Sequence, residues 1–212
     1  MILAIETSAS VCSVGFFSDG KLLTEYQSDA PMKHSELVGD FVEQGLKENK
    51  EKIKLVCVAI GPGSFTGLRI GLSYAQGFCF GRDIPIVGVS NHQILAKQGM
   101  QNQEIYTIID AYRQEFYLAK HIVNDIMDIE SHRIIKKSEI ENELPDGCHL
   151  IFLENTLDNK EINEISKNIT CIRAKFKTAL LAEIGYLKFL KDSGQNLEEL
   201  QPMYIRPFAG IQ

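Results

Sequence analysis

The residue types best suited to chemistry gather in two short turns, each of which follows an apolar run. The first turn, Glu6-Thr7-Ser8, places a carboxylate beside two hydroxyls at the end of the run 2–6. The second turn, Gly61-Pro62-Gly63-Ser64, follows the run 55–60 and leads into residues with helical spacing. Backbone N–H groups at the start of a helix can bind an anion, and Ser64 stands where a helix cap is expected. A phosphate-binding turn and a purely structural corner are both consistent with this pattern.

Neither turn carries a complete nucleotide-binding motif. The stretch from Gly61 to Gly71 lacks the Lys-Ser/Thr of a Walker loop and the G-x-G-x-x-G spacing of a dinucleotide-binding turn. A kinase of the sugar-kinase type needs a glycine in the turn after its first strand, and residues 6–10 contain none. A nucleotide-facing role therefore stays open beside a structural one for Glu6, Thr7, Ser8, Gly61, Gly63 and Ser64.

The histidines and cysteines predict neither a metal site nor a catalytic one. Ala96 stands where a paired H-x-x-x-H motif starting at His92 would place its second imidazole, so we interpret His92 as a surface or capping histidine. The sequence contains no H-E-x-x-H and no G-x-S-x-G. The five cysteines form no C-x-x-C pair and are expected to be reduced and buried. We therefore expect no catalytic residues and no metal.

Small residues recur along the helix expected from Thr66 to Gly81. Gly67, Gly71 and Ala75 follow one another at intervals of four, and each helical glycine costs roughly 1 kcal/mol relative to alanine. A close approach of another backbone would offset that cost. The approaching backbone belongs either to this chain's own first helix or sheet, or to a partner chain, and the sequence leaves both alternatives open.

Apolar periodicity divides the chain into two similar halves. Three strands, a helix, a strand, a helix, a strand and a helix lead to residue 103, and the pattern restarts at Ile105. Asp19-Gly20 predicts a tight antiparallel hairpin, whereas later strands joined by helices should be parallel. The prediction is an α/β fold with mixed sheets and βββαβα repeats, divided into lobes 1–103 and 104–212. The main expected helices are 34–49, 66–81 and 178–190, and the expected strands are 2–6, 11–17, 22–27, 55–60, 84–89, 105–110, 115–123, 129–135, 150–153 and 169–172.

Composition narrows the class of protein further. The chain has 212 residues, of which 44% are hydrophobic and 24% charged, and its formal net charge is −6. This acidic balance argues against independent binding of nucleic acid, which requires clustered Lys and Arg. The start of the chain has no basic segment before Glu6, and no apolar run reaches the length of a membrane span. We expect a cytoplasmic protein.

The stretch from Ile60 to Gly71 closely resembles the signature of the TsaB (YeaZ-like) family. The resemblance is strong over residues 1–118, weak over 120–200, and recurs near the C-terminus. Three positions depart from the family pattern: Glu6 replaces the usual Asp, Val38-Gly39-Asp40 replaces Leu-Leu-Pro, and Tyr112 replaces a common Arg. The further matching segments are Ile2 to Ser8, Lys33 to Glu36, Ile84 to Ser90, Asp110-Ala111 with Glu115 and Tyr117, and Pro202, Tyr204 and Arg206.

This resemblance implies the two-lobed fold of the actin, Hsp70 and sugar-kinase (ASKHA) superfamily and a non-catalytic relative of TsaD. TsaD transfers threonylcarbamoyl to the tRNA adenosine next to the anticodon, TsaB-type chains support it through a helical interface, and the ATPase TsaE joins them. The resemblance implies only indirect contact with tRNA and no intrinsic cofactor. ATP or ADP at the boundary with TsaD, and a homodimer of the isolated chain, stay open. The residues expected at the partner interface are His34, Leu37, Phe41, Gly67, Leu68, Gly71 and Ala75.

Two other classes of function remain as alternatives. An independent ATPase or small-molecule kinase of this fold predicts ATP turnover by the isolated chain. A metal-dependent peptidase predicts stoichiometric bound metal, but it follows only from the glycoprotease (M22) label that the family has carried. We therefore favour the partner subunit of a tRNA-modifying complex.

Overall fold

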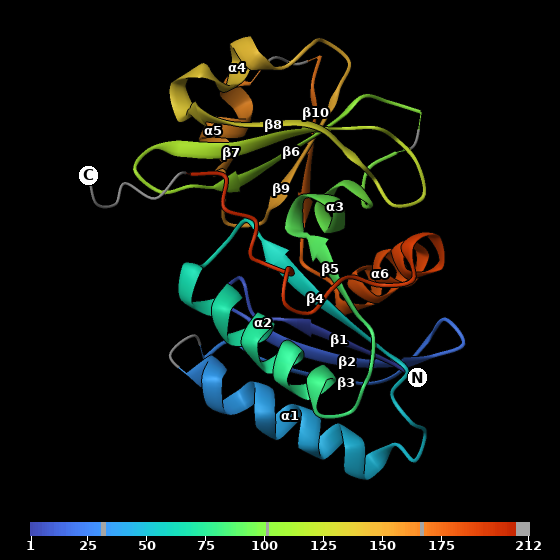
Figure 1. Cartoon of the computed structure of the whole chain (residues 1–212). Coiled ribbons are helices and arrows are strands. Elements are labelled where there is room, and N and C mark those ends of the chain that lie inside the picture. The colour runs from blue at the N-terminus through green and yellow to red at the C-terminus, as the bar shows by residue number, and fades with distance from the viewer. Residues whose placement is uncertain (31–32, 101, 166–167, 207–212) are drawn as a thin grey trace, which may run out of the picture. The chain divides into compact units, whose positions relative to one another are not determined.

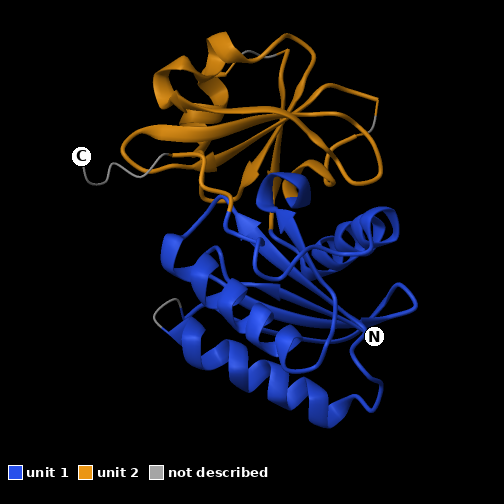
Figure 2. Cartoon of the chain, viewed as in Figure 1, with its two compact units in different colours: residues 1–94, 176–202 blue, residues 95–175, 203–212 orange. Residues whose placement is uncertain are grey.

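The computed structural model describes residues 1–30, 33–100, 102–165 and 168–206, which Figure 1 draws as labelled elements. The chain divides into two compact units, coloured separately in Figure 2. Unit 1 contains Met1–Ile94 and Phe176–Pro202, and unit 2 contains Leu95–Lys175 and Met203–Gln212. The sequence had assigned all of 104–212 to one lobe. The division differs because the last helix and the segment after it pack on the first sheet.

Unit 1 is built on a five-stranded mixed sheet in the order β3-β2-β1-β4-β5. The chain enters through three antiparallel strands, and β4 and β5 then run parallel to β1. The expected tight turn at Asp19-Gly20 joins β2 to β3, and both of its residues have positive φ. The strands are β1 (Ile2–Glu6), β2 (Cys12–Ser18), β3 (Lys21–Ser28), β4 (Leu55–Gly61) and β5 (Ile86–Ser90).

Helices cover both faces of this sheet. On one face, α1 (His34–Glu48) and α2 (Phe65–Phe80) bury their apolar stripes against alternate strand residues such as Leu3 and Val56. On the other face lies α6 (Thr178–Asp192), whose Gly185 packs tightly on Cys57 of β4. Because successive strand residues point to opposite faces, Val56 and Cys57 mark the two sides of the sheet.

The segment after α6 covers the free edge of β5. The Gln195 N–H donates to the Ile86 carbonyl at 3.0 Å, and the Gly88 N–H donates to Gln195 Oε1 at 2.7 Å. Gln76 of α2 donates to the carbonyls of Leu197 and Leu200, at 2.5 and 3.0 Å. Residues 195–200 therefore form a strap that supplies the hydrogen bonds an edge strand would otherwise lack.

Unit 2 repeats the same sheet with much smaller helices. Its order is β10-β9-β6-β7-β8, so the strands that follow one another in sequence occupy the same places as in unit 1. The doubled βββαβα pattern and the α/β class of the actin, Hsp70 and sugar-kinase type are thus confirmed. The strands are β6 (Ile105–Asp110), β7 (Glu115–His121), β8 (Ile129–Lys136), β9 (His149–Leu153) and β10 (Thr170–Ala174), and the helices are η2 (Lys137–Glu139), α4 (Ile140–Glu143) and α5 (Asn159–Glu164). The short helix α3 (Asn91–Ala96) begins in unit 1 and ends in unit 2.

Two further expectations can be compared with the structure. All five cysteines are free, four of them are buried, and Cys171 is half-buried. Within the described ranges, no helix is both long and apolar enough to cross a lipid bilayer. Residues 202–206 adopt no helix or strand, and Pro207 lies outside the described residues.

Candidate functional site

The last residues of the three parallel strands of unit 1 meet at one edge of the sheet. Glu6 ends β1, Gly61 ends β4 and Ser90 ends β5. In open α/β sheets this carboxyl edge is where ligands bind. We call the polar side chains gathered there the turn cluster, and it comprises Glu6, Thr7, Ser8, Ser64, Ser90 and Asn91.

Glu6 and Ser8 form the centre of the turn cluster. Glu6 Oε1 accepts hydrogen bonds from the backbone N–H of Ser8, at 2.6 Å, and from the Ser8 hydroxyl. Asn91 Nδ2 donates to Ser8 Oγ at 2.5 Å and to the Pro62 carbonyl at 2.8 Å. The amide of Asn91 thus joins the first turn to the second. The sequence had predicted Glu6 and Ser8 for this site but not Asn91.

A second set of hydrogen bonds attaches the start of α2 to the turn cluster. The Ser64 N–H donates to the Ser8 carbonyl at 2.7 Å, and the Ser64 hydroxyl accepts from the Gly67 N–H at 3.2 Å as the helix cap. The Ser90 hydroxyl donates to the Gly61 carbonyl at 2.9 Å. Two N–H groups near the start of α2 are therefore already bonded within the chain, which favours the structural corner over a phosphate cradle.

Close packing against Thr7 explains two glycines of α2, Gly67 and Gly71. A Cβ added to Gly67 would overlap the Thr7 carbonyl, and one added to Gly71 would overlap the Thr7 hydroxyl. That hydroxyl donates to the Gly67 carbonyl at 2.7 Å. Of the two alternatives that the sequence left open, this chain's own backbone is the one that approaches these glycines.

The structure places most residues of the predicted partner interface inside unit 1. Five of the seven are buried there: His34, Gly67, Leu68, Gly71 and Ala75. Leu37 and Phe41 are half-buried, because they pack on the core of unit 1. The exposed residues of α2 are instead Thr66, Arg69, Ser73, Gly77 and Phe80, with Phe65 at its start.

Burial gives the Glu6 carboxyl an unusual proton affinity. Only 2% of Glu6 is exposed, and desolvation raises its pKa to about 7, against a smaller opposing effect of the bonds from Ser8. Among the described residues, Glu6 Oε2 and Asn91 Oδ1 have no hydrogen-bond partner. Both are buried acceptor atoms, and the burial of an unpaired carboxylate oxygen favours the neutral form of Glu6.

Neither His92 nor His34 lies in an arrangement typical of metal ligands. His92 is fully buried at the start of α3. It was interpreted as a surface or capping histidine, and the first of these two interpretations is therefore wrong. Its backbone N–H donates to the Ser90 hydroxyl at 3.2 Å. His34 begins α1, and its Nε2 lies 3.2 Å from the Ser10 carbonyl. Within the described ranges, no group of three His, Cys, Asp or Glu residues is placed to hold a metal ion.

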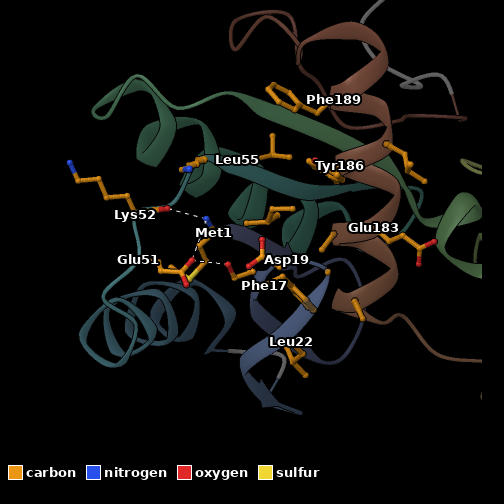
Figure 3. A pocket seen from close by; sticks show the side chains of 17 residues that line it. Met1, Phe17, Asp19, Leu22, Glu51, Lys52, Leu55, Glu183, Tyr186 and Phe189 are labelled. Carbon is orange, nitrogen blue, oxygen red and sulfur yellow. Dashed lines mark hydrogen bonds and ion pairs between the residues drawn. The ribbon is translucent and has the colours of Figure 1, made fainter.

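A groove of about 1070 Å³ lies at the opposite end of the same sheet (Figure 3). Tyr186 and Phe189 of α6 line one side of it, and Phe17 and Leu22 of the β2–β3 hairpin line another. Because Met1 lines the groove, the groove lies at the amino-terminal end of β1, away from the edge where ligands bind in such sheets. It contains none of the predicted site residues, so the turn cluster remains the candidate site.

Comparison with known proteins assigns the chain to a family. A family model described as TsaD, tRNA N6-adenosine threonylcarbamoyltransferase, matches residues 27–171, which is more than half of the chain. The tRNA threonylcarbamoyladenosine biosynthesis protein TsaB of Haemophilus influenzae is 24% identical over 222 residues, covering 97% of this chain and 93% of that protein. The chain belongs to the TsaB/YeaZ family.

Two other relatives of this TsaB/YeaZ family member are similar over different lengths. TsaB of Escherichia coli is 31% identical over 150 residues, and the match spans 67% of this chain but only 64% of that protein. The structure of YeaZ from Pseudomonas aeruginosa superposes with a TM-score of 0.79 at 21% identity, covering 96% of this chain and 98% of that one. The resemblance stated from the signature at Ile60 to Gly71 is thereby confirmed.

Proposed function

We propose that this chain takes part in the biosynthesis of threonylcarbamoyladenosine in tRNA, as a non-catalytic subunit that pairs with TsaD. Family membership carries this proposal, because the relatives named TsaB are described as biosynthesis proteins for that nucleoside. In this role TsaE joins the complex through TsaD, and tRNA contacts the chain only indirectly. An adenine nucleotide at the boundary with TsaD is part of the same proposal.

The hydrogen bonds of the turn cluster favour a structural role for its residues rather than a catalytic one. Its hydroxyls and carboxylate bond one another and the neighbouring backbone. Gly63 lies so close to the Ser8 carbonyl that the two turns touch, which leaves little room for a phosphate between them. The cluster therefore acts as a brace that holds α2 on the sheet.

The exposed stripe of α2 is the surface that we propose for TsaD. Its members recur at helical spacing and combine small residues with one large apolar side chain, Phe80, which is 83% exposed. An added Cβ on Gly77 would meet no other atom within 4 Å, so a second helix could approach closely there. The stripe consists of Thr66, Arg69, Ser73, Gly77 and Phe80.

Light scattering after size exclusion tests this surface. The wild-type chain is mixed with TsaD from the same organism, and Gly77→Leu is compared with Ala179→Leu. Both variants add the same kind of side chain at an exposed helical position, but α2 and α6 lie on opposite faces of the sheet. We expect Gly77→Leu to weaken the complex and Ala179→Leu to leave it unchanged.

Two results would contradict the proposal. Equal binding by both variants would remove the α2 stripe from the interface. Absence of any complex with wild-type chain, together with ATP turnover by the chain alone, would favour the independent ATPase.

A further inference from the structure

The turn between β6 and β7 has an unusual backbone. Tyr112, Arg113 and Gln114 follow one another with φ of 60°, 57° and 63°. Positive φ is uncommon for residues other than glycine, because Cβ approaches the neighbouring backbone. Three such residues in sequence therefore store strain in this turn.

The tight hairpin between β2 and β3 shows which residues usually occupy a turn with positive φ. The β2–β3 turn also needs two positive φ values, and it has Asp19 at 50° and Gly20 at 74°. Asp-Gly and Asn-Gly are the usual pairs for this geometry. The β6–β7 turn instead uses Tyr112 and Arg113, so its residues are not explained by the backbone they adopt.

Neighbouring groups hold the strained turn in place. Asp110 Oδ1 accepts from the Tyr112 N–H at 2.8 Å, and the Ala111 N–H donates to the Glu115 carbonyl at 3.0 Å. From the C-terminal segment, Arg206 forms an ion pair with Glu115 and donates to the Ala111 carbonyl at 3.4 Å. These bonds hold the turn in one conformation, so it presents its three side chains from a rigid backbone.

The presented side chains are of types that are common in protein interfaces. Tyr112 is 68% exposed, and Arg113 and Gln114 are also exposed. Within the described part of the chain, the Arg113 guanidinium has no ion-pair partner. Tyrosine and arginine are the residues that most often carry the binding energy of interfaces, and a rigid turn loses little entropy on binding.

The surrounding charges favour protein over nucleic acid as the partner. The nearby cations are each paired with a carboxylate: Arg206 with Glu115, Lys136 with Glu139, and Lys137 with Glu161. Among the described residues around this turn, Arg113 therefore stands as one unpaired cation rather than as part of the cluster that phosphates require. One guanidinium beside a phenol suits a carboxylate at the rim of an apolar recess.

We propose that the β6–β7 turn is a second protein-contact element, in which Tyr112 enters an apolar recess and Arg113 pairs with a carboxylate of the partner. The inference rests on the proposed function, since TsaD is the partner to be used as probe. It adds to that function a contact on unit 2, separate from the α2 stripe.

The double variant Tyr112→Asn/Arg113→Gly tests the proposal. It restores the usual residues of the turn, so its melting temperature should rise, by about 2–4 °C if about 1 kcal/mol of strain is released. Its affinity for TsaD should fall by about tenfold or more. The matched control is Asp19→Asn in the β2–β3 turn, which should leave the affinity unchanged.

Each other outcome has a defined meaning. Unchanged affinity of the double variant for TsaD would overturn the contact, while the proposed function would stand. A lower melting temperature would overturn the strain on which the argument depends. Loss of salt-dependent tRNA binding with unchanged TsaD affinity would assign the turn to RNA instead. No binding of TsaD by the wild-type chain would reject the proposed function and this inference together.

Discussion

The first strand of each unit ends in a carboxylate with the same local bond but a different environment. Glu6 accepts from the N–H of Ser8, two residues further on, as Asp110 accepts from the N–H of Tyr112. Glu6 is buried, whereas Asp110 is exposed. The strand order is the same in both units, so the sheets do not account for the difference.

The helix after the fourth strand differs between the two units. In unit 1 this helix is α2, whose sixteen residues include the glycines that pack on Thr7. In unit 2 it is α5, which has six residues. The long helix packs on the first corner, whereas the corner after β6 keeps Tyr112, Arg113 and Gln114 exposed.

The largest effect is expected from breaking the contact between α2 and Thr7. In Gly67→Val a branched side chain would overlap the Thr7 backbone, so we expect a loss of more than about 3 kcal/mol or failure to fold. Urea unfolding followed by circular dichroism measures this. Normal stability would show that the corner does not depend on close packing. Gly71 also packs on Thr7, so Gly71→Leu would test the folding of unit 1 rather than a partner interface.

Glu6→Gln tests the burial of the first carboxylate. Because burial raises the pKa of Glu6 to about 7 from an ordinary 4.5, the folded chain retains a proton that the unfolded chain releases between these values. The contribution of Glu6 to stability therefore falls as the pH rises through this window. Glu6→Gln should match wild type near pH 4.5 and exceed it by up to about 3 kcal/mol above pH 8.

Urea unfolding of both proteins from pH 4.5 to 8.5 checks this dependence. Asp110→Asn is the matched control, because it alters an exposed carboxylate at the same place in unit 2, and it should change stability by less than about 0.5 kcal/mol. A constant difference between Glu6→Gln and wild type across this range would argue against a buried, protonated Glu6.

Thr7→Val examines the hydrogen bond of the brace without altering its shape. The variant removes the donor to the Gly67 carbonyl but keeps the branched side chain, so we expect a loss of about 1–2 kcal/mol. Thermal unfolding monitored by calorimetry is suitable. If Thr7→Val were as damaging as Gly67→Val, the hydroxyl rather than the close packing would hold α2.

Gly77→Ala should have the smallest effect and the opposite sign. An added Cβ meets nothing within 4 Å, so the variant should gain up to about 1 kcal/mol from helix propensity. Urea unfolding beside Gly67→Val separates glycines that α2 needs for packing from one that it does not. A loss of stability would mean that Gly77 has a structural role in the isolated chain.

Local patterns predicted most of the fold. Apolar periodicity located the strands, Asp19-Gly20 located a hairpin, and the doubled order of elements matched two equivalent sheets. The sequence also singled out residues of the first and second turns, which the fold brings together through bonds such as that from the Ser64 N–H to the Ser8 carbonyl. These features depend on residues near one another in sequence, which a single sequence displays.

The features that sequence did not predict depend on distant neighbours. The glycine spacing of α2 was correct evidence for close packing, but only the fold identifies Thr7 as its neighbour. Asn91 follows β5 without any motif, and the carboxyl end of a parallel strand is the only signal that could have located it. The run from Tyr112 to Gln114 contains no glycine and so gives no sign of positive φ.

The return of α6 and the strap to unit 1 also affects how the chain folds during synthesis. Until residue 200 has left the ribosome, one face of the first sheet has no helix over it, and the edge of β5 has no strap. Every strand of unit 2 lies within 105–174 and so emerges earlier. The first sheet is thus covered only after every strand of unit 2 has been made, which departs from the usual vectorial order of domain folding.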